Sequence, residues 1–156
     1  MGPHDIRTGV PIRLAAAERA ANLVDLVHRS VERHPDRLAL RWKVRRGTPN
    51  AADETKHEAA DGAGWVSWTY RELWDRVEAV SIGLARLGMR HGDRVAILSR
   101  SRPEWVVADL ACLAVGTVTC PIYSGERPDK VAFMVRNVDA RFIFAENATL
   151  SGRSPE

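Results

Sequence analysis

The most regular pattern in the chain is a helical one that begins at Thr69. Thr69 and Glu72 form a capping box, in which the Thr hydroxyl accepts from the Glu72 amide and the carboxylate reaches back to the cap. Gly88 follows where a helix end needs a left-handed residue. Burying a large apolar side chain contributes roughly 1.5–3 kcal/mol, so we expect this helix to anchor the fold. Its apolar residues recur every three or four positions: Leu73, Val77, Val80, Leu84 and Leu87.

Three further segments show the spacing of helices. The first, over 15–34, ends before a proline, since the residue that precedes proline avoids helical geometry. The second begins at another capping box, Ser101 with Glu104, carries Pro103 in its first turn and ends at Gly116. The third follows a turn over 124–129. The residues that we expect to face inward are Val106, Leu110, Leu113 and Ala114 in the second helix, and Val131, Met134, Val135 and Val138 in the third.

Strand patterns lie between these helices. Apolar and polar residues alternate over 38–44, and the short run 65–68 is placed to pair back onto that strand. The apolar runs 94–98, 117–123 and 141–145 are each of strand length. Strands that alternate with helices through short connections are typical of a parallel sheet covered by helices. We therefore expect an α/β fold, a layered α/β/α arrangement with a mostly parallel sheet, an N-terminal helix and a short β-hairpin, with the strand order open.

The domain organisation follows from the same pattern. Residues 15–147 form one partial domain, while 1–14 show no sustained period and predict a loose leader. The segment 47–64 holds Gly, Pro, Asn, charges and Ala without a larger apolar residue, which predicts an exposed loop. Beyond residue 147 the pattern stops, and 148–156 are expected to be an irregular tail.

Composition excludes several classes of protein. The 156 residues are 45% hydrophobic and 28% charged, as in ordinary globular domains. The net charge of +3 is spread along the chain, so we expect no nucleic-acid partner. No apolar run is long enough for a transmembrane segment, and the first residues lack the pattern of a signal peptide, which predicts a cytoplasmic protein. Cys112 and Cys120 lack the neighbours of a disulfide framework or metal site.

Motifs of catalysis are missing from the sequence. It has no GxGxxG or GxSxG, and Gly83 and Gly88 have the spacing of a phosphate-binding loop only within a helix and its end. The five histidines are scattered, and we expect them to be solvated. Two segments, 99–102 and 124–125, follow strands at the edge where parallel sheets bind ligands. The alternative for 99–102 is that Ser101 only caps its helix and the arginines are solvated.

Several pieces of the sequence resemble one family in order and spacing. They are WTYREL, LGMRHGDRVAIL, SRPEWVVADLA and TVTCPIY. Together they make 69–147 similar to the amino-terminal subdomain of AMP-forming acyl-CoA synthetases, most of all the long-chain fatty acyl-CoA synthetases. The segment 23–42 also resembles the first helix and strand of that family. An unrelated α/β binder, such as a flavodoxin-like domain, is disfavoured by this match of several pieces.

The resemblance implies a reaction in two steps. A fatty acid carboxylate attacks the α-phosphate of ATP with the help of Mg²⁺, and the thiol of CoA then displaces AMP from the acyl-adenylate. In the family a Gly/Thr-rich loop that ends in Lys and a lysine on a mobile lid serve this chemistry. Neither is present here, so we assign no catalytic residue and no metal ligand.

The resemblance, together with the missing catalytic motifs, leaves two possible functions. The first is an amino-terminal fragment of a long-chain fatty acid–CoA ligase, inactive alone, that binds none of ATP, Mg²⁺ or CoA tightly. The second is a stand-alone, non-catalytic α/β interaction module that acts with a synthetase in trans. In both cases we expect the partner to be the remainder of a synthetase or a second copy. By resemblance, Ser124 and Gly125 hold a turn near the CoA nucleotide, where Gly permits close backbone approach.

Overall fold

A computed structural model describes residues 20–43 and 64–147 of the chain. The leader over 1–14, the predicted loop apart from Gly64, and the tail over 148–156 lie outside the described residues. The helices and strands are α1 (Leu23–Arg33), β1 (Leu38–Lys43), β2 (Trp65–Thr69), α3 (Tyr70–Arg86), β3 (Arg94–Leu98), α4 (Pro103–Val115), β4 (Val118–Ile122), α5 (Pro128–Asn137) and β5 (Phe142–Ala145).

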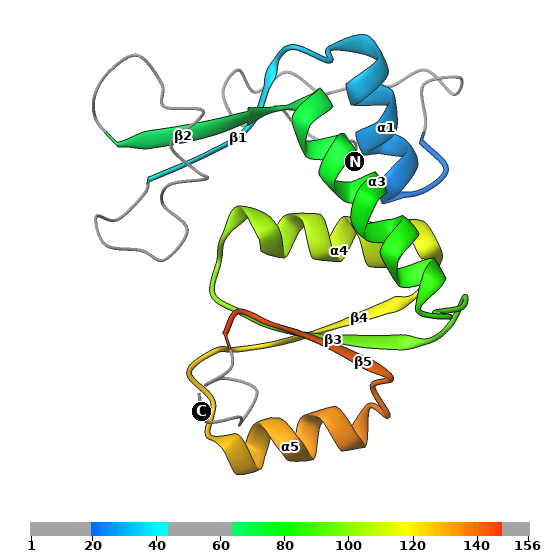
Figure 1. Ribbon diagram of the computed structural model, residues 1–156, viewed down its shortest axis with the longest axis vertical. Helices are drawn as coiled ribbons and strands as arrows, with labels where there is room; N and C mark the ends of the chain where they lie inside the picture. Colours follow the sequence, from blue (N-terminus) through cyan, green and yellow to red (C-terminus); the bar gives the residue numbers. More distant parts are fainter. Residues whose placement is uncertain (1–19, 44–63, 148–156) are drawn as a thin grey trace, which may run out of the picture.

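Three strands form a parallel sheet in the order β4-β3-β5. The chain leaves β3 through α4 to reach β4, and then crosses back through α5 to the other side of β3. Because right-handed crossovers in opposite directions along a sheet place their helices on opposite faces, α4 covers one face and α5 the other. Figure 1 shows this layering, with α3 lying across α4. The predicted α/β/α fold with a parallel sheet is confirmed.

The central strand β3 carries the core on both of its faces. Val95 packs in a cluster with the α3 and α4 side chains, whereas Ala96 and Leu98 pack in a second cluster with α5. Each of the three is at most 1% exposed. A continuous apolar run is expected for a parallel strand that is covered on both sides.

Helix α3 begins and ends as the sequence predicts. The Glu72 amide donates to the Thr69 hydroxyl at 3.3 Å, and the Thr69 amide donates to the Glu72 carboxylate at 2.7 Å. Gly88 has a left-handed φ of 79°. Leu73, Val77 and Leu84 are buried and Val80 is half-buried, but Leu87 is 62% exposed. The prediction for Leu87 was wrong, because Leu87 caps the helix beyond its last turn.

Helix α4 departs from its prediction at the start and in its buried face. Its N-cap is Arg102, with no side-chain hydrogen bond to the cap, so the Ser101–Glu104 capping box is wrong. Pro103 takes the first helical position and places Glu104 in the second rather than the third. Of the four residues expected to face inward only Leu110 is buried. The helix is apolar on most sides and lies between the sheet and α3, so spacing does not single out one face. The residues buried instead are Pro103, Val107, Ala108, Ala111 and Cys112.

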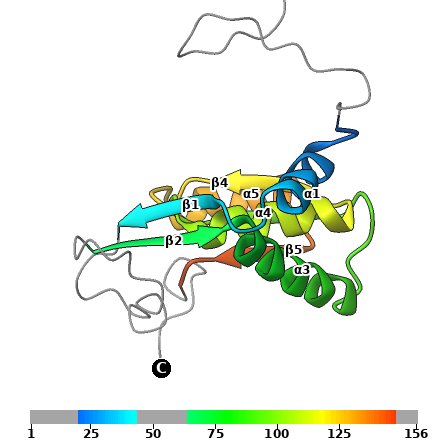
Figure 2. The ribbon, with the colours of Figure 1, turned by 90° about the horizontal axis from the view of Figure 1, so that it is seen from above.

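The amino-terminal strands form a separate antiparallel hairpin. Leu40 pairs with Trp68 and Trp42 with Val66, which confirms the predicted pairing. The register shifts between Leu38 and Leu40, and Leu38 is 56% exposed instead of facing inward as the alternation predicted. Since β2 leads directly into α3, the hairpin projects away from α1 and α3 (Figures 1 and 2). Among the described helices, none has the length and apolarity needed to cross a membrane.

Candidate functional site

The carboxyl ends of the three parallel strands lie in register at one edge of the sheet. Leu98 is opposite both Ile122 and Ala145. The loop after β3 leads to α4 on one face, while the loop after β4 leads to α5 on the other. Open α/β sheets bind ligands where connections diverge in this way. Both predicted candidate segments, 99–102 and 124–125, lie at this edge.

A cluster of charged side chains joins two of the strand ends. Glu146 follows β5, and its side chain is only 7% exposed. It accepts the backbone N–H of Arg100 at 3.0 Å and also binds the Arg100 guanidinium. Arg102 lies 3.6 Å from Glu146 and donates to Glu104 at 2.6 Å. The structure therefore holds both arginines of the candidate segment against carboxylates.

The cluster strongly favours the ionised form of Glu146. The hydrogen bond from the Arg100 side chain, together with the Arg100 amide and the charge of Arg102, outweighs desolvation and lowers the pKa of Glu146 to about 2. The same pairing raises the pKa of Arg100. Sequence reasoning missed Glu146, although its position directly after the last strand was a signal. A cavity of about 250 Å³ adjoins the cluster, lined in part by Ser99, Arg102 and Glu146.

The second candidate segment is an open turn after β4. Ser124 is half-buried and Gly125 is exposed. A Cβ built on Gly125 meets nothing within 4 Å, so the space directly beside this backbone is open. Two cations follow in the chain: Arg127 pairs with Asp129 at 3.2 Å, and Lys130 pairs with Glu126 at 2.8 Å.

The described residues offer no cluster of metal-binding side chains: no three His, Cys, Asp or Glu gather in a way that could hold an ion. His28 is half-buried rather than fully solvated, with its ring 4.8 Å from that of Trp74. His34 and His91 are exposed as expected, and the two other histidines lie outside the described residues. Burial raises the pKa of the Cys112 thiol, which suits a core residue rather than a nucleophile.

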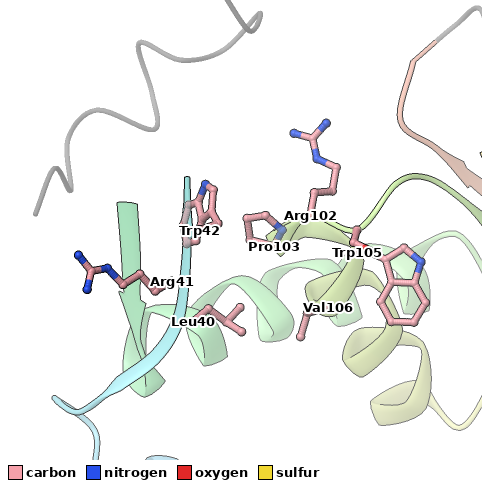
Figure 3. A pocket seen from close by; sticks show the side chains of 8 residues that line it. Leu40, Arg41, Trp42, Arg102, Pro103, Trp105 and Val106 are labelled. Carbon is pink, nitrogen blue, oxygen red and sulfur yellow. The ribbon is translucent and has the colours of Figure 1, made fainter. Parts of the chain in front are cut away.

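A larger cavity lies between β1 and the first turn of α4; it includes Ser101 and Arg102 of the predicted segment 99–102, but sequence reasoning missed the contribution of β1. We refer to it as the hairpin–α4 cavity; its volume is about 410 Å³. Figure 3 shows the indole of Trp42 beside Pro103, with Leu40 and Val106 further along the cavity. The indole Nε1 of Trp42 is buried and has no hydrogen-bond partner. The residues that line the cavity are Leu40, Arg41, Trp42, Ser101, Arg102, Pro103, Trp105 and Val106.

Comparisons with known proteins place this geometry in context. The family model described as AMP-binding enzyme matches residues 27–155. The chain is 39% identical over 98 residues to the long-chain-fatty-acid–CoA ligase FadD15 of Mycobacterium bovis, covering 58% of this chain and 16% of that protein. It is 33% identical over 125 residues to the acetyl-coenzyme A synthetase of Streptomyces avermitilis, covering 80% of this chain and 16% of the synthetase.

A solved structure has the same fold. It is the N-terminal subdomain of Klebsiella oxytoca NpsA in complex with 3-hydroxyanthranilyl-AMSN, with a TM-score of 0.68 and 23% identity. The similarity covers 88% of this chain and 30% of that one. The chain thus spans about a sixth of the length of the curated relatives named above.

Proposed function

Because the chain belongs to the AMP-binding enzyme family, we propose that it forms the amino-terminal part of an AMP-forming long-chain fatty acid–CoA ligase. The identity of 39% with a ligase of that class over 98 residues carries the proposal. In the reaction a fatty acid carboxylate attacks the α-phosphate of ATP and releases pyrophosphate. The thiol sulfur of CoA then attacks the acyl carbonyl, the thiol proton is lost, and AMP leaves. The alternative, a stand-alone interaction module, is not favoured by these comparisons.

The described residues supply a scaffold rather than the reacting groups. Among residues 20–43 and 64–147, no three His, Cys, Asp or Glu side chains gather in a way that could hold a metal ion on their own. Of the two lysines in these ranges, Lys43 ends β1 at an exposed position and Lys130 pairs with Glu126. Neither follows a glycine-rich loop that could surround the phosphates of ATP. We therefore assign activation of the carboxylate to parts of the ligase outside these residues.

We propose that Ser124 and Gly125 contact the nucleotide portion of CoA. The open space around Gly125 supports this assignment, because a ligand can approach the backbone there without displacing a side chain. The turn also lies at the carboxyl edge of the sheet, and Arg127 and Lys130 add positive charge beside it. CoA would supply the thiol that accepts the acyl group.

We further propose that exposed apolar side chains of this chain pack against the remainder of a ligase. Ile82 is 47% exposed and Leu87 62% exposed at α3, while Val118 is 51% exposed on the edge strand β4. Exposed apolar surface and open strand edges favour association. In the absence of the remaining ligase, a second copy of the chain is the expected partner.

A chimeric ligase tests the proposed function. The matching segment of the M. bovis ligase FadD15 is replaced by that of this chain, and formation of acyl-CoA from palmitate, ATP and CoA is measured. We expect turnover within about tenfold of the parent, that is, a barrier change of about 1.4 kcal/mol or less. A folded chimera without acyl-CoA formation would contradict the assignment.

The CoA contact is tested in the same chimera by Gly125→Trp, which fills the open turn. We expect KM for CoA to rise while KM for ATP is unchanged. Gly83→Ala, in α3 where an added Cβ also meets nothing within 4 Å, is the matched control. An active chimera whose KM for CoA does not respond to Gly125→Trp would refute the contact and leave the ligase assignment standing.

A further inference from the structure

The two outer strands of the parallel sheet differ in what their free edges present. In the described part of the chain the strand order is β4-β3-β5, so β4 and β5 each have a neighbouring strand on one side only. An edge strand carries unpaired N–H and C=O groups and is a template for a further strand. All four residues of β5 are half-buried, whereas four of the five residues of β3 are buried. This difference agrees with an outer edge of β5 that is open to solvent.

The hydrogen bonds to β3 determine which backbone groups of β4 point outward. The amide of Val118 donates to the carbonyl of Asp93 at 2.8 Å, so Val118 faces β3. The N–H and C=O of one residue point to the same side of a strand, and successive residues alternate between the two sides. Thr119 and Pro121 consequently face away from β3. Because proline has no N–H, Thr119 supplies the only amide donor of β4 along its outer edge.

The same reasoning gives β5 a complete outer edge. The amide of Glu146, directly after the strand, donates to the carbonyl of Leu98 at 3.1 Å, so Glu146 faces β3. By alternation Ile143 and Ala145 face outward, and each presents one N–H and one C=O. The amide of Arg141 also donates to β3, but Arg141 lies before the first residue of the strand. The strand itself holds only Phe, Ile and Ala, so the proline that protects the β4 edge has no counterpart in β5.

The outward groups of β5 are complementary to those of a second copy that runs antiparallel. When Phe144 lies on a twofold axis, Ile143 is opposite Ala145 of the other copy. Opposed residues of this kind exchange both of their N–H···O bonds, so no outward donor or acceptor of the two strands remains unmet. Two β4 edges in the same arrangement would place Thr119 opposite Pro121, and half of these bonds would be missing. The edge of β5 is therefore the better match for a copy of itself.

The charges beside β5 agree with this direction of pairing. Arg141 precedes the strand and Glu146 follows it, so antiparallel pairing sets the arginine end of one strand beside the glutamate end of the other. Each of these side chains also has a partner within its own copy, Arg141 with Asp93 at 2.7 Å and Glu146 with Arg100. The contact thus joins ends of opposite charge and leaves neither of the two flanking charges unpaired.

We propose that two copies of this chain associate through the outer edges of β5, antiparallel about a twofold axis at Phe144. The two sheets then form one continuous sheet in the order β4-β3-β5-β5-β3-β4. Both copies use the same surface, as in most closed dimers. The β4 strands lie at the two ends, where Pro121 disfavours the addition of further strands. This proposal specifies the surface for the association with a second copy that is proposed above, and it does not depend on the ligase assignment.

Proline substitutions on the two edges test the proposal in the whole chain. Ala145→Pro removes an outward N–H of β5, and Thr119→Pro, the matched control, removes the outward N–H of β4. Neither amide faces β3, so the hydrogen bonds within each sheet are retained. Sedimentation velocity over a hundredfold range of protein concentration measures the dissociation constant of the dimer. Circular dichroism and urea unfolding verify that each variant is folded.

We expect wild type and Thr119→Pro to form the dimer with the same affinity. Ala145→Pro should raise the dissociation constant about tenfold or more, because each copy loses a donor at the contact. Amide hydrogen exchange gives a second readout that requires no variant. The amides of Ile143 and Ala145 should become protected as the concentration of wild type rises, while the amide of Thr119 stays unprotected.

Three results would overturn the proposal. The first is a wild-type chain that stays monomeric over the whole range of concentration. The second is a dimer that Thr119→Pro weakens as much as Ala145→Pro does. The third is a dimer in which the Ile143 and Ala145 amides exchange as fast as in the monomer. The second and third results would assign self-association to another surface, and all three leave the ligase assignment to the separate test in the chimera.

Discussion

Glu146→Gln removes the carboxylate that joins the loop after β3 to the end of β5. The folded protein holds the pKa of Glu146 at about 2 instead of its ordinary 4.5. A difference of that size corresponds to about 3 kcal/mol of stability at neutral pH. The side chain of Arg100 is 69% exposed, so solvent screens part of the interaction. We therefore expect Glu146→Gln to lower the free energy of unfolding by about 1–2 kcal/mol at pH 7.

The lowered pKa of Glu146 determines how the difference in stability between wild type and variant changes with pH. The pKa of Glu146 is lower in the folded protein, so its contribution is fully present above the unfolded value of 4.5 and is lost as pH falls toward about 2. Urea unfolding of wild type and variant, measured from pH 7 down to pH 3, should show a difference that declines below about pH 5 and is less than half of its neutral value at pH 3.

A matched control separates this pair from an ordinary surface pair. Asp36 lies 3.5 Å from Arg71, with side chains 85% and 58% exposed, and Asp36→Asn should change stability by less than about 0.5 kcal/mol. The reasoning about the cluster would be refuted if Glu146→Gln changed the free energy of unfolding as little as Asp36→Asn does. It would also be refuted if the effect of Glu146→Gln were constant between pH 7 and pH 3.

The remaining predictions concern backbone positions and helix caps, each measured by urea unfolding. Gly116→Ala should destabilise by about 1–2 kcal/mol, because φ is +82° and the new Cβ would lie 2.8 Å from the His91 ring. Gly92 has a similar φ and open space around it, so Gly92→Ala should lose only the stability that the strained backbone costs. Gly83→Ala in α3 should stabilise the protein by about 0.5–1 kcal/mol. A Gly116→Ala protein as stable as Gly83→Ala would contradict this ranking of stabilities. Thr69→Ala should lower the free energy of unfolding by about 1 kcal/mol, because it removes the cap of α3. Ser101→Ala removes no cap of α4 and should leave the free energy of unfolding almost unchanged. Equal decreases in the two variants would contradict the assignment of Arg102 as the N-cap of α4.

Local signals in the sequence predicted local structure. The capping box at Thr69 and Glu72 and the left-handed Gly88 fixed both ends of α3, because these features depend on residues only a few positions apart. The same rule failed at Ser101, where Pro103 at the first helical position shifted the start of α4 by one residue. Its buried face was also mispredicted, since a helix with apolar residues on most sides carries no single stripe.

The site features depend on contacts between distant parts of the chain. Glu146 meets Arg100 because β5 pairs in parallel with β3, across 46 positions of sequence. The hairpin–α4 cavity joins Trp42 of β1 to Pro103 and Val106 of α4. The spacing of apolar residues within one segment cannot predict which distant segments come into contact. Strand order and helix packing decide it, and the sequence pattern left both open.

The most direct test of the ligase assignment compares the purified chain with the active chimera. Each is incubated with palmitate, ATP and Mg²⁺, and palmitoyl-AMP is measured by mass spectrometry. We expect palmitoyl-AMP from the chimera and none above background from the chain, because we assign activation of the carboxylate to parts of the ligase outside its described residues. Palmitoyl-AMP formed by the chain on its own would contradict the account.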